Sequence, residues 1–458
     1  MSRLPETELE SSVDLIADAA IADRPFWRTS AWRRRTGRTS IGVWAATALA
    51  FGGSVIAARA LGPGPYGRVV LALAVVGLVA TFLDLTLEEA VVHHGARALA
   101  AQDHGRLRSI LRIALLIDVA IGIAVFAGIM FAAGLLASAA SGGFLDSDLI
   151  RLAALATLAA TTEGTSGAVL LLAGRPDVRG WTMAWTGLAR LLGALIAVQF
   201  GGPRAVLIGF AVAAAIGGLT QLAVSWHIGW RHWSAAGPNT EKVRVGRALV
   251  VFGFHSSLTT SITALRTALV PLVLGRTAGS VAVGLFQVGS FPVTMAGVAS
   301  LPVRMALLPE QAQLAAHGDT NALKGSVRAY TKAALMIGIP AVVAGWFLLP
   351  WLLTTLYGDR FQGAVLPARI LLVAGLAFLV VAWGKILPAA VGRPALRTRV
   401  MLLELILALS LTALLASRGA VGGAIASAIT GVVVAIVWWM VASRVRAVDP
   451  VTLPRERS

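Results

Sequence analysis

Residues 57–77 read AARALGPGPYGRVVLALAVVG, a short glycine- and proline-rich turn between two apolar runs. Glycine reaches positive φ without strain and proline fixes φ at about −65°, so the segment from Gly62 to Gly67 predicts a tight turn. A phosphate-binding role for this turn is disfavoured, because it lacks the lysine and the helix context of a P-loop. The flanking runs 41–60 and 67–92 have the length of about 20 residues that crosses a bilayer as a helix. This stretch therefore predicts a transmembrane helical hairpin.

The hydrophobicity of this hairpin extends along the whole chain. Of 458 residues, 57% are hydrophobic and 13% are charged, with a mean hydropathy of +0.79, whereas a soluble protein carries about 25% charged residues. Cysteine is absent, which excludes disulfides and thiolate sites. Lipid offers no partners to backbone groups, so the sequence predicts an all-α integral membrane protein with continuous helices. The twelve expected spans are 41–60, 67–92, 109–135, 150–173, 178–200, 204–227, 247–273, 280–308, 328–356, 364–390, 396–416 and 420–442.

Positive charge is distributed unevenly between the two sets of loops. The set that includes both tails carries 27 Lys and Arg residues, the other carries 8, and the remaining 4 lie in or beside spans. Cytoplasmic loops hold the excess of Lys and Arg, so the tails 1–40 and 443–458 are expected in the cytoplasm. The net charge of +17 is then a topology signal, and no nucleic-acid partner is expected. Only 4 of 39 basic residues are lysine, which suggests a GC-rich bacterial source. The expected location is the bacterial cytoplasmic membrane, which the chain crosses many times.

The sequence repeats itself at an offset of 216 to 218 residues. Three motifs recur in the same order, which predicts two homologous halves of six spans each. Because six is even, the copies share one orientation, as in transporters built from parallel repeats with a substrate site between them near the bilayer midplane. We expect an N-lobe at 41–228, a cytoplasmic linker at 229–246 and a C-lobe at 247–442, with transport by alternating access. The first two motif pairs are Arg59-x-x-Gly62-x4-Gly67 with Arg276-x-x-Gly279-x4-Gly284, and Asp103-x3-Leu107 with Asp319-x3-Leu323. The third pair is Gly174-Arg175-Pro176, which is followed by Arg179, with Gly392-Arg393-Pro394, which is followed by Arg397.

A polar cluster is expected halfway through the membrane, around Arg266. This residue lies about ten residues from the predicted external turn, hence about 15 Å deep at 1.5 Å per residue, and its depth-equivalent on the next span is Gln287, with no acid available. Polar residues share one helix face on each of these spans, so we expect them to line a cavity. Arginine suits a diphosphate because its planar guanidinium donates bidentate hydrogen bonds, while a structural role, bonding backbone carbonyls, stays open. The expected substrate-binding residues are Arg266, His255, Thr259, Thr263, Gln287, Ser290, Thr294 and Arg304.

Two charge pairs at membrane depth are related by their distance from a turn. Glu163 and Arg190 are equally distant from the turn between the fourth and fifth spans. Lys385 and Glu404 occupy the matching positions in the second half. Charges inside a bilayer are costly unless they have a partner or face water. Each pair is therefore expected either to form an ion pair across its hairpin or to line the cavity.

Three acids lie in the cytoplasmic halves of the second and third spans, namely Asp84, Glu88 and Asp118. Asp84 and Glu88 share a helix face because they are four residues apart. Burial raises the pKa of a carboxyl group, so these acids could exchange protons in a coupling site. The alternative is that they pair with Arg108 or Arg112 near the cytoplasmic rim.

Five stretches of the chain carry a pattern known from one transporter family. They are AARALGPGPYGRVVLALAVVG (57–77), DLTLEEAVVHHGARALAAQDHGRLRSILR (84–112), LYGDRF (356–361), GRPALRTRV (392–400) and GAVGGAIASAI (419–429). Together they resemble the polysaccharide-biosynthesis flippases of the multidrug/oligosaccharidyl-lipid/polysaccharide exporter (MOP) superfamily, with a departure at Thr86, where the family often has glycine. The resemblance implies two six-helix lobes around a central cavity and transport of a polyprenyl-diphosphate-linked oligosaccharide for cell-surface polysaccharide export. The partners it implies are the lipid-linked glycan, membrane lipids, a polysaccharide polymerase and glycosyltransferases.

Other functions are open or less favoured. A flippase of lipid-linked peptidoglycan precursors uses the same physics and stays open. A cation-coupled multidrug exporter of the same superfamily needs acids on its cavity face, and the span 41–60 has no Asp or Glu. A membrane enzyme needs a folded external loop or a cluster of catalytic acids; the external connections are short, so no catalytic residue is assigned. No metal or other cofactor is expected, because His93 and His94 point to different helix faces and no metal-ligand spacing occurs.

Overall fold

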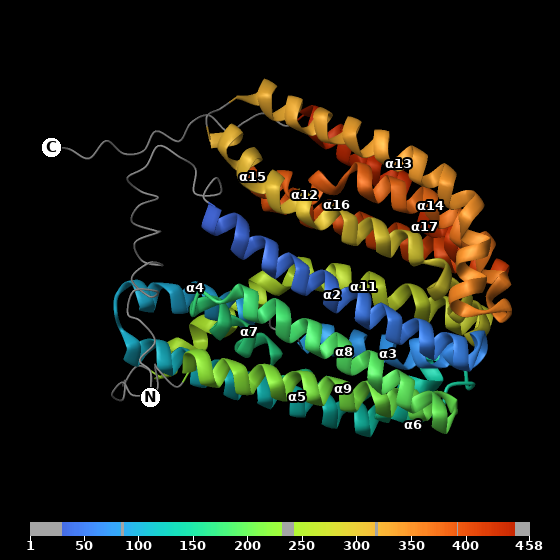
Figure 1. Cartoon of the computed structure of the whole chain (residues 1–458), viewed down its shortest axis with the longest axis horizontal. Helices are drawn as coiled ribbons and strands as arrows, with labels where there is room; N and C mark the ends of the chain where they lie inside the picture. The colour runs from blue at the N-terminus through green and yellow to red at the C-terminus, as the bar shows by residue number, and fades with distance from the viewer. Residues whose placement is uncertain (1–29, 84–86, 231–241, 317–318, 392, 445–458) are drawn as a thin grey trace.

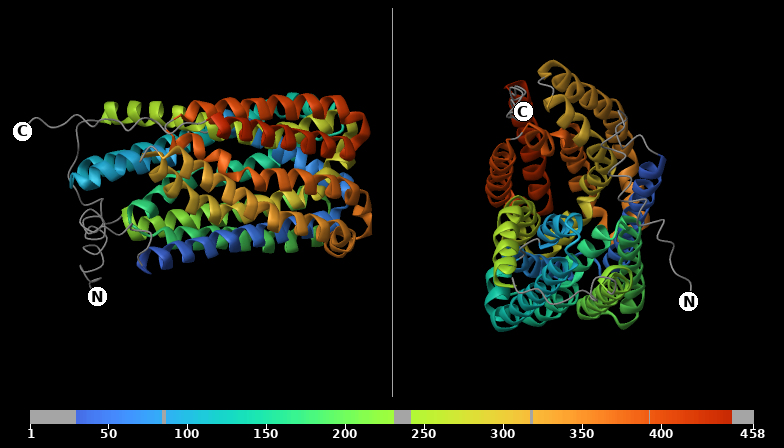
Figure 2. Two further views of the ribbon diagram at one scale, coloured as in Figure 1. Left: turned by 90° about the horizontal axis from the view of Figure 1, so that it is seen from above. Right: turned by 90° about the vertical axis from the view of Figure 1, so that its left-hand side faces the viewer.

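The computed structural model describes residues 30–83, 87–230, 242–316, 319–391 and 393–444, and the elements within these ranges are helices. Most of them run along one long axis (Figure 1), as Figure 2 also shows from above. The first described helix begins and the last one ends at the same end of the molecule, which we call the termini end. At the opposite end, the glycine-turn end, several turns have a glycine at positive φ, a conformation that is strained for other residues.

By chain order we divide the helices into two groups, the N-bundle and the C-bundle. The N-bundle consists of α2 (Ser30–Leu61), α3 (Pro63–Leu83), α4 (Leu87–Ala100), α5 (His104–Ser141), α6 (Ser147–Ala160), α7 (Glu163–Leu172), α8 (Pro176–Phe200), α9 (Gly202–Ser225) and the π-helix η2 (Trp226–Trp230). The C-bundle consists of α11 (Lys242–Gly289), α12 (Phe291–Ala316), α13 (Thr320–Tyr357), η3 (Asp359–Ala364), α14 (Val365–Val380), η4 (Ala382–Lys385), α15 (Leu387–Ala390), α16 (Pro394–Leu415), η5 (Ala416–Arg418) and α17 (Gly419–Arg444). Helix α11 is counted with the second group, although it lies beside α3 in Figure 1.

The described helices include ten stretches that are long and apolar enough to cross a membrane. Two of them are too long for one crossing: Ser261–Ser300 has 40 residues and Ala395–Arg444 has 50, whereas about 20 residues suffice. Each contains a glycine with positive φ, Gly279 at 81° and Gly419 at 62°, where the helical path is interrupted. When these two stretches are counted as two crossings each, the described chain has the twelve expected from the sequence. It is a multi-pass membrane protein.

The duplicated aspartates of the second motif pair begin two long helices in the same way. The Asp103 carboxylate accepts a hydrogen bond from the backbone N–H of Arg106 at 2.8 Å, at the start of α5. Asp319 accepts one from Ala322 at 2.8 Å, at the start of α13. A side chain at this position satisfies an N–H group that has no partner within the helix. The repeat in sequence thus encodes a repeated helix start.

Two spans that the sequence predicts to be continuous are interrupted. The span expected at 150–173 is divided between α6 and α7, and the one expected at 364–390 is divided between α14 and α15 by η4. The two interruptions occupy matching places in the repeat. Interrupted backbone within a membrane is tolerated where it is buried in protein or faces water. Here the first interruption borders the buried Thr165 and the second the buried Trp383.

The two bundles share a core at the glycine-turn end. The largest apolar cluster combines buried residues of both bundles, including Leu71 and Ile129 with Leu274 and Phe361. Across the junction, the rings of Tyr66 and Phe361 lie 6.4 Å apart in an edge-on arrangement. Helix α11 packs along α3 and also contacts α16 and α17, so it lies between the bundles. Two smaller clusters are confined to one bundle each, which leaves the glycine-turn end as the principal junction.

Candidate functional site

Arg266 in α11 lies beside an acid, contrary to the expectation from sequence. Its Nε atom is 3.3 Å from Oε1 of Glu404 in α16, and the side chains are 32% and 18% exposed. The two come together because α11 packs along α16, with apolar contacts around Met401 and Leu405. The prediction of an uncompensated arginine at this depth is therefore wrong. Glu404 balances the charge and lowers the cost of placing it in the membrane.

The ion pair occupies only one edge of the Arg266 guanidinium. Glu404 is reached through Nε, and within the described part of the chain neither Nη atom has a hydrogen-bond or ion-pair partner. A guanidinium has five N–H donors arranged in a rigid fork. The carboxylate can therefore hold the arginine in a fixed orientation while the Nη donors stay available to an anion.

The other residues of the expected cavity wall differ in their surroundings. Thr263 is half-buried, whereas Gln287 and Thr294 are exposed. The hydroxyl of Ser290 donates to the carbonyl of Gln287 at 2.6 Å, and that of Thr294 donates to the carbonyl of Ser290 at 3.3 Å. Both hydroxyls can still accept a hydrogen bond, so the role of these residues in substrate binding stays a prediction. The remaining members, whose side chains lie outside the described residues, are His255, Thr259 and Arg304.

The predicted ion pair between Lys385 and Glu404 is wrong. Glu404 pairs with Arg266, and the Lys385 ammonium lies 4.7 Å from the ring centre of Phe378. A cation over an aromatic face is attracted by the negative charge density of the ring. Equal depth on two helices brings two side chains together only if both helices turn the right face, and here α16 turns Glu404 toward α11.

The hairpin pairing of Glu163 with Arg190 is also wrong. The Arg190 guanidinium lies 4.4 Å from the ring centre of Phe210 in α9, and the ion pairs found among described residues include none between Glu163 and Arg190. The interruption between α6 and α7 accounts for the difference. Glu163 is the first residue of α7, so its direction is not that of a residue on one continuous span.

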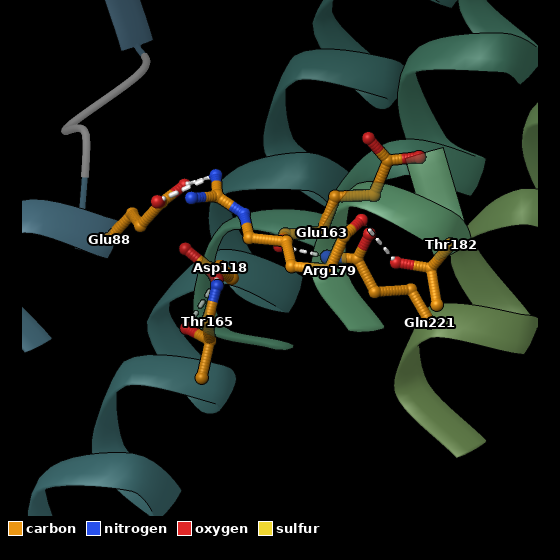
Figure 3. A network of polar contacts seen from close by, with 7 residues as sticks. All are labelled: Glu88, Asp118, Glu163, Thr165, Arg179, Thr182 and Gln221. Atoms are coloured by element: carbon orange, nitrogen blue, oxygen red, sulfur yellow. Dashed lines mark hydrogen bonds and ion pairs between the residues drawn. The ribbon is translucent and has the colours of Figure 1, made fainter. Parts of the chain in front are cut away.

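A second polar region, which we call the N-bundle network, surrounds the interruption between α6 and α7 (Figure 3). Its side chains come from α4, α5, α7, α8 and α9, so five helices meet there. The sequence indicates its three acids as candidate charges at membrane depth, but not the side chains that bind them. The members are Glu88, Asp118, Glu163, Thr165, Arg179, Thr182 and Gln221.

Asp118 of α5 binds the first turn of α7. Its Oδ2 accepts hydrogen bonds from the backbone N–H of Thr165 at 3.2 Å and from the Thr165 hydroxyl at 2.5 Å. The N–H groups in the first turn of a helix have no partner within the helix, and that end of the helix favours negative charge. The interruption of the span thus creates the site that Asp118 occupies.

Glu88 pairs with Arg179 of α8, so for this acid the expected pairing with Arg108 or Arg112 is wrong. One terminal guanidinium nitrogen of Arg179 lies 2.6 Å from Oε1 and 2.7 Å from Oε2 of Glu88. The arginine is 28% exposed and the glutamate 29%. The guanidinium passes close to Gly167, where a Cβ would lie 3.0 Å from its Nε. In the sequence, Arg179 is only the last residue of a repeated motif, and the motif does not indicate that its side chain points into the bundle.

Glu163 stands apart within the N-bundle network. Its carbonyl oxygen accepts a hydrogen bond from Gln221 Nε2 at 2.7 Å, whereas its carboxylate points away from the Glu88–Arg179 pair (Figure 3). Within the described part of the chain this carboxylate has no hydrogen-bond or ion-pair partner. It remains a candidate for proton coupling. Asp84, the third acid of the predicted coupling site, lies outside the described residues.

Comparisons with known proteins give one family and several similar structures. The model of the family described as "Polysaccharide biosynthesis protein" matches residues 33–315. Among solved structures, an inward-facing multidrug resistance MATE family transporter of the MOP superfamily is 16% identical, covering 86% of this chain and 93% of that chain with a TM-score of 0.75. The lipid II flippase MurJ in an inward closed conformation is 13% identical, covering 88% of this chain and 87% of that chain with a TM-score of 0.67.

A third similar structure belongs to a transporter whose binding pocket differs. It is a MOP superfamily transporter from Pyrococcus furiosus, described as having a reversed polarity of its binding pocket that suggests a different function. It is 16% identical, covering 90% of this chain and 95% of that chain with a TM-score of 0.61. No curated protein sequence matches the chain significantly. The structural similarities, all at low identity, establish the fold.

Proposed function

This chain belongs to the polysaccharide biosynthesis protein family of the MOP superfamily, and from that premise we propose that it flips a polyprenyl-diphosphate-linked oligosaccharide across a bacterial cytoplasmic membrane. The lobes 41–228 and 247–442 would rock against each other by alternating access. The substrate enters from the cytoplasmic leaflet, where glycosyltransferases build it. It leaves on the outer side, where a polymerase uses it.

The orientation follows from the distribution of charge. Loops at the termini end carry the larger share of Lys and Arg, and such loops stay in the cytoplasm. The glycine-turn end therefore faces the outside. This assigns the closely packed junction between the bundles to the outer side of the membrane.

The observation that carries the proposal is the guanidinium of Arg266, whose Nε contacts Glu404 while its Nη donors remain available. A diphosphate group presents several charged oxygens, and two parallel N–H donors can bind two of them at once. Glu404 holds Nε, so little side-chain entropy is lost when the Nη donors bind an anion. Thr263 lies one helical turn before Arg266 on the same face and can bond the sugars or phosphate oxygens.

Two other classes of substrate are alternatives to the lipid-linked oligosaccharide. A peptidoglycan precursor also carries a lipid diphosphate, and the likeness to MurJ makes it the second candidate. An organic cation is disfavoured, because the crossing Thr39–Leu61 contains no acid.

The proposal is tested with purified protein in proteoliposomes that contain a labelled lipid-linked oligosaccharide. Arrival in the opposite leaflet is read by periodate, which does not cross the bilayer and oxidises only accessible sugars. We expect Arg266→Gln to reduce the initial rate about tenfold or more, since a bond to a charged group contributes about 1.5–3 kcal/mol. Arg204→Gln is the matched control, because Arg204 bonds the exposed Asp148 within the N-bundle, and it should transport normally.

Three results decide between the candidates. Transport of the peptidoglycan precursor alone would assign the chain to that substrate. Transport of an organic cation alone would overturn the proposed flippase. A folded Arg266→Gln variant with full transport would remove Arg266 from the binding site.

A further inference from the structure

Two exposed arginines reach across the junction between the bundles at the glycine-turn end. Arg59, in the last turn of α2, donates from Nη1 to the carbonyl of Thr355 at 2.6 Å and to that of Leu356 at 3.4 Å, in α13 of the C-bundle. Arg276, in α11, donates from Nη1 to the carbonyls of Ser138 and Ala139 at 3.3 Å each, in α5 of the N-bundle. Each bundle thus supplies one arginine to the other.

The two contacts are copies of each other. Arg59 and Arg276 are the first residues of the duplicated motif and are separated by 217 positions. The acceptors are separated by the same 217 positions, Ser138 from Thr355 and Ala139 from Leu356. The shift of 217 residues that relates the two halves therefore converts the Arg59 contact into the Arg276 contact, with the roles of the two bundles exchanged. An isolated surface contact would have no reason to recur in this way.

The acceptors lie where a cation is most favoured. Helix α5 ends at Ser141 and α13 at Tyr357, so all four carbonyls belong to a last helical turn. Carbonyls in a last turn lack part of the hydrogen bonding of a helix interior, and that end of the helix dipole is negative. The Ser138 carbonyl also accepts from the backbone N–H of Gly142 at 2.9 Å. Each arginine adds a donor to a helix end on the opposite bundle.

The last glycine in each copy of the duplicated motif, Gly67 or Gly284, lies where the two bundles are in contact. A Cβ on Gly67 would overlap the carbonyl oxygen of Ser280, and one on Gly284 would overlap that of Pro63. These two contacts are again related by 217 positions. Only glycine allows backbones to approach this closely, so the motif joins the bundles at its glycines and fastens them at its arginines.

We propose that Arg59 and Arg276, with their four carbonyl acceptors, form a reciprocal latch that holds the outer side of the transporter closed. The latch rests on the proposed function, in which the bundles rock apart at this end. Opening the outer side breaks both halves, because each half joins the same two bundles. Both arginines are exposed, so water can replace the broken bonds and the latch can open and close reversibly. The two arginines thus set the population of the outward-open state.

The test measures the distance between the bundles at the glycine-turn end. The chain has no cysteine, so Gln199→Cys in α8 and Ser417→Cys in η5 provide unique attachment points for two spin labels. Both positions are exposed and lie outside the latch. Pulsed electron paramagnetic resonance on the full chain in lipid nanodiscs then gives the distribution of distances.

We expect one short distance in the parent protein and a second, longer one in the double variant Arg59→Gln/Arg276→Gln. Each single variant should shift the population toward the longer distance about tenfold, as expected for loss of a bond to a charged group, and the double variant should shift it further. Arg204→Gln, at the same end but bonded within its own bundle, should leave the distribution unchanged. Arg59→Lys keeps the charge at the helix end and should give an intermediate shift.

Unchanged distances in the double variant, with the labels intact and the protein folded, would overturn the latch. A shift as large in Arg204→Gln would also overturn it, because the effect would then follow surface charge in general. The measurement needs no substrate. If the longer distance appears while no lipid-linked glycan is transported, the latch stands and the proposed substrate is wrong.

Discussion

The N-bundle network and a cluster of three tryptophans in the C-bundle occupy the same place in the two copies of the repeat. This tryptophan cluster, in which the first ring packs against the other two, consists of Trp383, Trp438 and Trp439. At the offset of 218 residues, Thr165 and Gln221 correspond to Trp383 and Trp439. Trp383 is fully buried, its ring centre lies 5.8 Å from that of Trp439, and its Nε1 donates to the Thr331 hydroxyl at 3.2 Å. The two copies of the repeat share their helix ends and interruptions, but the side chains at this place are polar in the N-bundle and aromatic in the C-bundle.

The difference between the polar network and the aromatic cluster indicates that the two bundles have different roles. A polar network with a carboxylate that has no partner among the described residues, Glu163, can change its charge and its hydrogen bonds. The aromatic cluster around the buried Trp383 has no ionisable side chain, and it stabilises the fold through buried area. We therefore expect proton-dependent steps to involve the N-bundle and the C-bundle to move as a rigid unit.

The largest expected effect comes from removing the centre of the aromatic cluster. Trp383→Ala should lower the free energy of unfolding by about 3–5 kcal/mol, as large-to-small changes in a packed core do. At the corresponding position, Thr165→Ala should cost about 1–2 kcal/mol, since it removes one hydrogen bond to a carboxylate. Chemical unfolding in detergent micelles, followed by tryptophan fluorescence, measures both. Equal losses would mean that the two bundles do not differ in the way described.

A smaller effect is expected from the ion pair of the network. Arg179→Gln should cost about 1–2 kcal/mol, because it leaves Glu88 without its partner in a half-buried place, where screening reduces the loss. Adding Glu88→Gln to this variant should restore part of the stability. The control is Arg175→Gln, whose pair with Asp177 spans 3.4 Å at a side chain 49% exposed. A control as damaging as Arg179→Gln would show that the network adds nothing beyond surface charge.

The smallest effects should be equal in the two bundles. Asp103→Ala and Asp319→Ala each remove a helix-start hydrogen bond of 2.8 Å and should each cost about 1 kcal/mol. The same unfolding experiment compares them, with Asp→Asn at either position as the control that keeps an acceptor. A clear inequality would show that the copies have diverged at their helix ends as well as in their interiors.

Several features of the fold could be predicted from the sequence because they depend on neighbouring residues. Apolar length predicts the crossings, and the duplicated Asp103 and Asp319 mark helix starts. The interruption between α6 and α7 was not predicted, because residues 150–173 are as apolar as an unbroken span. The contact that accompanies it comes from another helix, where Asp118 accepts the backbone N–H of Thr165 in the first turn of α7. No local pattern reports such a partner.

The polar sites depended most on features that the sequence leaves undetermined. Depth along a helix follows from counting residues, but the direction of a side chain follows from the rotation of the helix. Glu404 could have faced Lys385 at equal depth and instead faces Arg266. Arg179 could have remained at the start of α8, outside the bundle, and instead its side chain enters the bundle to reach Glu88.

By itself, the sequence determined that this protein is a duplicated bundle of apolar helices with its basic loops on one side, because hydropathy, turns and helix starts act over a few residues. Only the tertiary structure decided which charges are paired, where helices are interrupted and how the two copies of one motif fasten the bundles together. Those contacts join residues far apart in the chain. They are set by the packing of whole helices, which fixes rotation and crossing only when all of them are in place.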